Sequence, residues 1–153
     1  MTVELLIAFG IMGLCVVIHV AGIVLLGEQL VRQRERIEER VGFVYSAVLL
    51  MIVFAAAIFL HIIEATIWAA FYRWGSLFPD FETALYFSLT SYSTLGYGDA
   101  VLPQNWRLLG TMEGISGVLL CGLSAAFLFA IVNALFRFRV RRFMRDKPHR
   151  TES

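Results

Sequence analysis

Three long apolar stretches constrain this sequence more than any other feature. They cover residues 5–26, 41–74 and 108–136, and only His19 interrupts the first. A helix needs about 20 apolar residues to cross the hydrocarbon core of a bilayer. The composition agrees, because 59% of the residues are hydrophobic and only 16% are charged, against roughly a quarter charged in soluble domains. We therefore expect an all-α membrane protein with three transmembrane helices.

The basic residues predict how these helices are oriented. Of the 13 Lys and Arg residues, most lie in two blocks, 32–40 and 137–150. Segments rich in Lys and Arg stay in the cytoplasm, so we expect a multi-pass protein of the cell membrane with its N-terminus outside and its C-terminus inside. Both blocks adjoin apolar stretches. We therefore expect anionic lipid headgroups, and not nucleic acid, as partners of the basic tail.

Aromatic residues gather at the outer end of the second stretch. They are Trp68, Phe71, Tyr72 and Trp74. Trp and Tyr are enriched where a membrane meets water, so these residues predict an interfacial aromatic belt.

The segment between the second and third stretches is unusual for a loop. Asp80 precedes the helix-like run 81–89 and is suited to cap it, and Glu82 falls in the first turn, where negative charge favours the helix dipole. The run leads through hydroxyl residues into the Gly-containing segment 94–98. A half-helix that enters a membrane and returns as irregular backbone is tolerated only beside protein or a water-filled path. This segment therefore predicts a pore or a binding cavity.

The motif Ser93-Thr94-Leu95-Gly96-Tyr97-Gly98-Asp99 resembles the selectivity-filter sequence of potassium channels, Thr-Val-Gly-Tyr-Gly-Asp. The resemblance implies a pore-loop channel, with a re-entrant pore helix and filter between the second and third transmembrane helices. Residues 41–136 would form the pore domain, and the permeant ion would be K⁺. One filter strand cannot enclose an ion, so a homotetramer is implied. We expect neither a cofactor nor enzymatic activity.

Three further segments lie around the predicted pore domain. Residues 1–27 are expected to form a peripheral transmembrane helix, 28–40 a charged helical connector in the cytoplasm, and 137–153 a basic cytoplasmic tail. The first span has no Arg repeat, so it is not expected to sense voltage.

Five residues form the predicted K⁺ filter: Thr94, Leu95, Gly96, Tyr97 and Gly98. Aiming successive carbonyl groups inward requires left-handed dihedrals at alternate residues, which Gly adopts most easily. By resemblance, the Tyr97 ring packs against Tyr86 and Phe87, and Asp99 lies at the outer mouth. Leu95 replaces the usual Val or Ile and lacks their β-branching, which puts filter rigidity in question more than selectivity.

Two residues of the third span are predicted to support the filter. Some channels carry a Glu behind the filter where this chain has Thr90, and Glu113 is expected to supply that carboxylate instead. Gly117 lies where the pore-lining helix of the family often has a hinge glycine. The alternative for Gly117, shared with Gly110 and Gly114, is plain helix packing.

His61 and Glu64 share one face of the second span and could ligate a metal or exchange protons. A structural pair is the favoured alternative. Because a lone carboxylate in a membrane is costly, Glu64 is expected to pair with His61, with hydroxyl groups of the predicted pore helix, or with Glu113 through a shared proton. His19 lies deeper in its own span and is expected to make a separate packing contact.

Two other classes of protein compete with the channel interpretation. The first is an intramembrane enzyme or metal transporter built on His61, Glu64 and Glu113, which would leave the filter motif unused. The second is a regulatory subunit that binds lipid or partners through the basic tail. The second class predicts no ion flux from the protein alone.

Overall fold

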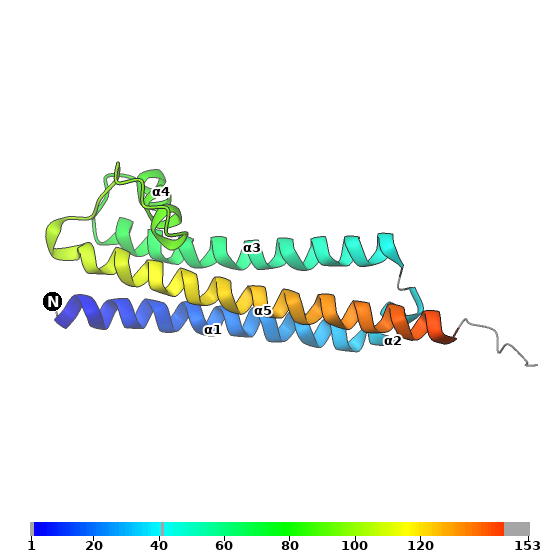
Figure 1. Cartoon of the computed structure of the whole chain (residues 1–153). Coiled ribbons are helices and arrows are strands. Elements are labelled where there is room, and N and C mark those ends of the chain that lie inside the picture. The colour runs from blue at the N-terminus through cyan, green and yellow to red at the C-terminus, as the bar shows by residue number, and fades with distance from the viewer. Residues whose placement is uncertain (1, 41, 146–153) are drawn as a thin grey trace, which may run out of the picture.

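In the computed structural model, residues 2–40 and 42–145 are described, and none of these forms a strand. The elements are α1 (Thr2–Arg32), α2 (Arg34–Arg40), α3 (Phe43–Trp74), α4 (Phe81–Tyr92), the short 3₁₀ helix η1 (Gln104–Trp106) and α5 (Arg107–Arg145). The helices α1, α3 and α5 run side by side, and α4 sits on one end of the bundle (Figure 1).

Three helices are long and apolar enough to cross a membrane, as predicted. They cover Val3–Arg32, Phe43–Trp74 and Gln104–Met144. The third continues as helix well into the predicted basic tail, and residues 146–153 of that tail lie outside the described part of the chain. The prediction of an all-α membrane protein is confirmed.

The charged connector is helical and almost continuous with α1. The amide of Gln33 donates to the carbonyl of Gln29 at 3.1 Å, and the amide of Ile37 donates to the carbonyl of Gln33 at 3.0 Å, which bridges α1 and α2. Ile37 is the buried residue of α2. The connector therefore continues the direction of α1 and packs on the bundle through the apolar side chain of Ile37.

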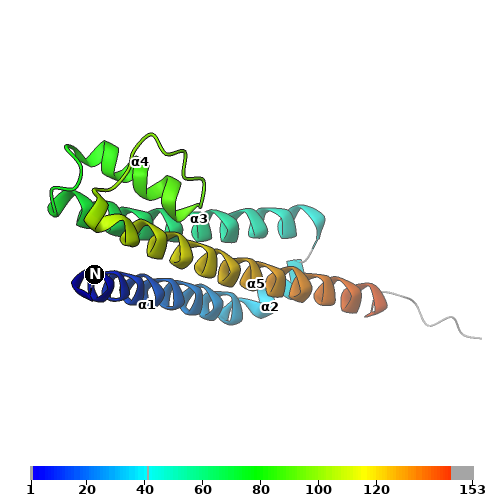
Figure 2. The same cartoon turned by 60° about the vertical axis from the view of Figure 1, so that its left-hand side comes forward.

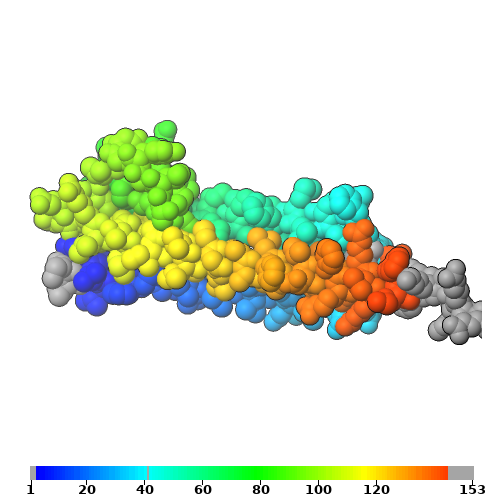
Figure 3. Space-filling model, viewed as in Figure 1, coloured from blue at the N-terminus to red at the C-terminus, as the bar shows by residue number. Residues whose placement is uncertain are grey.

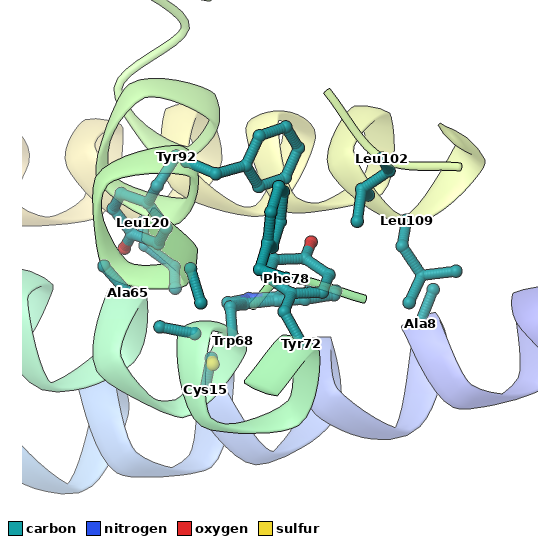
Figure 4. Packing of buried hydrophobic residues seen from close by; sticks show 13 residues of the cluster. Ala8, Cys15, Ala65, Trp68, Tyr72, Phe78, Tyr92, Leu102, Leu109 and Leu120 are labelled. Atoms are coloured by element: carbon teal, nitrogen blue, oxygen red, sulfur yellow. The ribbon is translucent and has the colours of Figure 1, made fainter. Parts of the chain in front are cut away.

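Two separate hydrophobic clusters hold the bundle together. We call the first the filter-end core, after the filter segment that is predicted at residues 94–98. Its centre includes Ala65, Trp68, Tyr72, Phe87 and Tyr92 from α3 and α4, with Cys15 of α1 and Leu109 of α5 (Figure 4). The second, the connector-end core, consists of Ile37, Val53, Ile131 and Leu135. In space-filling view, α4 and the segment after it project from the bundle at the filter end (Figure 3).

The predicted aromatic belt is wrong for two of its four members. Trp68 and Tyr72 are fully buried, whereas Trp74 is 91% exposed. Both buried residues belong to the filter-end core, where the Tyr72 ring makes edge-to-face contacts with Phe78 and Phe87. A buried Tyr needs a partner for its hydroxyl group, and Tyr72 finds one in Glu113.

Candidate ion-conduction site

The start of α4 follows the prediction from its capping residue. The carboxylate of Asp80 accepts a hydrogen bond from the Thr83 amide at 2.7 Å, and Glu82 lies in the first turn. Because the Asp80 carboxylate accepts this backbone hydrogen bond, its pKa is lowered from the ordinary value. The cap fixes the residue at which α4 begins. The helix then ends at Tyr92, directly before the predicted filter residues.

The backbone after α4 alternates in handedness. Thr94, Gly96 and Gly98 have positive φ angles of 61°, 51° and 82°, so every second residue is left-handed. The predicted dihedrals of the two glycines are present. Thr94 was not predicted to share them, and a β-branched residue in this region is strained. The turn is held by the Gly96 amide, which donates to the Thr90 carbonyl at 3.1 Å.

The side chains of this segment differ from the prediction at Tyr97. Tyr97 is 69% exposed, so its expected packing against Tyr86 and Phe87 is not formed within one chain. Instead, Tyr86 donates to Asp99 at 2.7 Å, while Phe87 packs on Tyr72 and Phe78. This hydrogen bond lowers the pKa of Asp99 and raises that of Tyr86.

Glycines of α5 form a close seam against α4. A β-carbon built on Gly110 would lie 3.0 Å from the Phe87 ring, and one on Gly114 would lie 3.1 Å from the Ser91 carbonyl. A β-carbon on Gly117 would overlap the carbonyl of Tyr92. The packing alternative therefore has direct geometric support at all three glycines, and a hinge at Gly117 stays a prediction.

Glu113 lies behind α4 and joins it to α3. Its carboxylate accepts a hydrogen bond from the Tyr72 hydroxyl at 2.7 Å and another from the Ser88 hydroxyl. Ser88 also contacts the carbonyl of Ala65, with its Oγ at 2.6 Å. The carboxylate is completely buried. This places Glu113 against the middle of α4, where it ties three helices together, rather than beside Thr90.

The carboxylate of Glu64 contacts polar side chains from α1, α3 and α4. His19 Nδ1 of α1 lies 2.8 Å from one carboxylate oxygen, and His61 Nδ1 lies 3.4 Å from the other, which also accepts from the Tyr92 hydroxyl. Two expected partners, His61 and an α4 hydroxyl, are therefore present. The expectation that Glu64 shares a proton with Glu113 is wrong, because Glu113 accepts its hydrogen bonds from Tyr72 and Ser88.

The expected separation of His19 from His61 is also wrong. Their ring centroids are 5.0 Å apart, and the other ring nitrogen of His19 lies 3.0 Å from Ser124 Oγ on α5. The role of Ser124 was not predicted, and Tyr92 was not singled out among the hydroxyl groups of α4. The one available signal was that an ionisable residue inside a span rarely lacks a polar partner.

A hollow of about 800 Å³ opens beside the segment after α4. It is lined by Thr94 and Gly96 on one side and by Gly110, Gly114 and Val118 of α5 on the other. The walls are mostly apolar, and the hollow faces out of the single chain.

An ion channel family matches residues 47–134, which is more than half of the chain. The protein therefore belongs to this ion channel family and is a membrane channel of the potassium-channel type. No curated protein and no solved structure gives a significant match. The matched region runs from α3 through α4 and residues 94–98 to α5, and it leaves α1 and the connector outside.

Proposed function

We propose that this protein conducts K⁺ selectively and passively across the cell membrane, through a filter made by residues 94–98 of four identical subunits. The observation that carries the proposal is the alternation of positive φ angles at Thr94, Gly96 and Gly98 directly after the capped helix α4. In this proposal α4 is the pore helix, α3 the outer helix and α5 the inner helix.

The alternating backbone suits K⁺ for a chemical reason. A weakly hydrated monovalent cation can exchange its water for neutral carbonyl oxygens without meeting a fixed excess of charge. In an ordinary extended strand, successive carbonyls point to opposite sides, and left-handed residues at every second position turn them toward one side. Gly96 and Gly98 adopt this conformation without the cost that a side chain would add.

The exposed groups around the filter support assembly with further copies. Leu95 and Tyr97 are 60% and 69% exposed, and the hollow along Gly110 and Gly114 is apolar. A neighbouring subunit around a central axis would cover these surfaces and supply the other strands of the filter. Tyr97 would then find its packing partners between subunits instead of within one.

The proposed orientation places the filter near the outer surface. The Arg residues of α2 and of the end of α5 lie together at the opposite end of the bundle (Figure 2), where positive residues favour the cytoplasm. Anionic lipid is the proposed contact of the basic tail, since each basic group near such a surface contributes about 1 kcal/mol.

Reconstitution of the purified protein into liposomes tests the function. We expect flux of K⁺ and Rb⁺ far above that of Na⁺, with block by Ba²⁺, and stronger flux in liposomes that contain anionic lipid. Comparable Na⁺ flux from well-folded protein would contradict selectivity. Absence of any flux would favour a regulatory subunit.

A further inference from the structure

We infer that His19, His61 and Glu64 form a binding site for one transition-metal ion of the Zn²⁺ class, held inside the membrane between α1 and α3. One potential ligand atom from each residue lies within 4.8 Å of the other two. His19 and Glu64 are fully buried, and the His61 side chain is 19% exposed. The bound ion would be resident, not permeant, since these residues lie behind α4 and not on the filter segment.

The chemistry of the three side chains suits zinc. Two imidazoles and one carboxylate are a ligand set with which proteins hold Zn²⁺ while leaving a fourth position open. Metal–ligand bonds of about 2.0–2.1 Å in a tetrahedron put ligand atoms roughly 3.3 Å apart. His19 Nδ1 lies 2.8 Å from one carboxylate oxygen of Glu64, and His61 Nδ1 lies 3.4 Å from the other oxygen. These separations are close to the required spacing, and the side chains would turn to share one ion.

The fourth position has a natural occupant. The Tyr92 hydroxyl lies 2.9 Å from His61 Nδ1 and also donates to Glu64. It is therefore within reach of an ion bound among the other three groups. Tyr92 comes two residues before Thr94, so an ion held here would join α1 and α3 to the base of the filter segment.

The groups around the three ligands also orient them for a metal. His19 Nε2 lies 3.0 Å from Ser124 Oγ, and this contact turns Nδ1 toward Glu64. Metal-binding histidines are commonly fixed in this way through their second ring nitrogen. On binding, the proton of His19 would reside on Nε2 and be donated to Ser124, which leaves the Nδ1 lone pair for the ion.

Charge favours a cation at this place. In the absence of an ion, the Tyr92 hydroxyl donates to Glu64 and His19 Nδ1 lies within hydrogen-bond distance of it. When these partners are neutral, an ionised Glu64 leaves one negative charge in the site. Within the described ranges 2–40 and 42–145, the ion pairs of Glu64 are with His19 and His61 alone, and none is with Lys or Arg. A charge inside a membrane is costly without an opposite charge beside it, and a bound cation would supply one to Glu64.

Metal analysis of the whole chain tests the inference without measuring ion flux. The protein is purified in detergent with an affinity tag that contains no histidine, incubated with Zn²⁺, freed of unbound ion by gel filtration and analysed by elemental mass spectrometry. We expect about one zinc ion per chain. His19→Gln and Glu64→Gln should lose this zinc, whereas the matched control His149→Gln, in the tail outside the described residues, should retain it.

A second measurement on the unchanged protein removes any dependence on how the variants fold. Co²⁺ in place of Zn²⁺ should give the intense visible absorption of a four-coordinate site with nitrogen and oxygen ligands. Parent protein that retains no zinc and gives no such Co²⁺ absorption would overturn the inference, as would equal zinc in His19→Gln and His149→Gln. These outcomes would leave the proposed conduction of K⁺ untouched, because the metal content is independent of flux.

Discussion

The filter end and the connector end of this bundle are stabilised in different ways. At the filter end, hydrogen-bonded polar side chains are buried together with the apolar ones: His19, Glu64, Ser88, Glu113 and Ser124. Among the described residues, the buried members of the connector-end core are Ile37, Val53, Ile131 and Leu135, and partly buried apolar and aromatic residues pack against them. Apolar contacts are tolerant of small displacements, whereas buried polar groups must meet particular partners. The fold therefore specifies geometry most strictly where the filter segment is attached.

Polar contacts at the connector end are on the surface. Arg142 donates to the carbonyl of Glu39 at 2.9 Å, and the Arg34 guanidinium lies 5.7 Å from the Phe138 ring. The pair Arg32–Glu28 is separated by 3.4 Å with both side chains more than half exposed. Exposed pairs of this kind contribute about 0–1 kcal/mol. The polar contacts at this end therefore contribute little to the free energy of folding.

The largest expected effect comes from Gly117→Ala. A β-carbon at this position overlaps the Tyr92 carbonyl, so α5 must shift away from the end of α4. We expect a loss of about 3 kcal/mol in folding free energy, together with loss of the filter geometry. Gly122→Ala is the matched control on the same helix, because nothing lies within 4 Å of its β-carbon position.

Thermal unfolding in detergent and gel filtration measure this difference. If both glycine variants unfolded at the same temperature as the parent, the claim that packing is strict at the filter end would be contradicted.

A smaller loss is expected from Glu113→Leu. The change leaves the buried Tyr72 hydroxyl without its acceptor, whereas the Ser88 hydroxyl can still donate to the Ala65 carbonyl. An unsatisfied buried hydroxyl costs about 1–3 kcal/mol. Adding Tyr72→Phe removes the stranded hydroxyl, so the double variant should unfold at a higher temperature than Glu113→Leu alone. A double variant that is less stable by the sum of both losses would contradict the described network.

Tyr86→Phe tests the exposed contact at the filter segment and should have a modest effect with a defined pH dependence. The pKa of Asp99 is lowered by its hydrogen bond with Tyr86, so that contribution to stability is present above the ordinary Asp value, near 4, and is lost as the pH falls further. The pKa of Tyr86 is raised, so its contribution is present below about 10 and is lost at higher pH.

The difference in unfolding temperature between parent and Tyr86→Phe should therefore be constant from about pH 5 to pH 9 and shrink on both sides. A difference that stays constant below about pH 4 would show that the hydrogen bond with Tyr86 does not lower the pKa of Asp99.

The smallest effect is expected from Arg142→Gln at the connector end. The change affects exposed contacts of Arg142, among them the hydrogen bond to the Glu39 carbonyl, and exposed contacts of charged side chains contribute little, so we expect a loss of about 0.5 kcal/mol. Unfolding temperatures of parent and variant should nearly coincide. A loss of folding free energy as large as that of Glu113→Leu would contradict the claim that polar contacts matter less at the connector end.

The structural features that depend on residues close together in the sequence could be predicted. The three spans follow from hydropathy, the Asp80 cap from its position before an apolar helix, and the left-handed conformations from Gly96 and Gly98. Each depends on residues close together in the chain, whose geometry is fixed by local sterics and hydrogen bonds.

Contacts between helices were harder to predict, and His19 shows why. It lies 17 residues from the start of α1, at Thr2, whereas Glu64 lies 10 residues from the end of α3, at Trp74. Counting from these ends would separate the two by about 10 Å at 1.5 Å per residue, yet their side chains are in contact. The relative heights and rotations of helices are set by packing between them, which no single helix encodes. The burial of Tyr72 was missed for the same reason.

Selective conduction through the alternating backbone is tested most directly by Gly98→Ala beside the Gly122→Ala control. Gly98 has a φ of 82° and open space around its β-carbon position, so the substitution acts through backbone conformation and not through a clash within the chain. The reversal potential of each protein in a planar bilayer, with K⁺ on one side and Na⁺ on the other, gives the selectivity. We expect the parent and Gly122→Ala to reverse at a potential set by K⁺ and Gly98→Ala to lose selective current. Parent currents that reverse near zero, or Gly98→Ala currents as selective as the parent's, would contradict a K⁺ filter at residues 94–98.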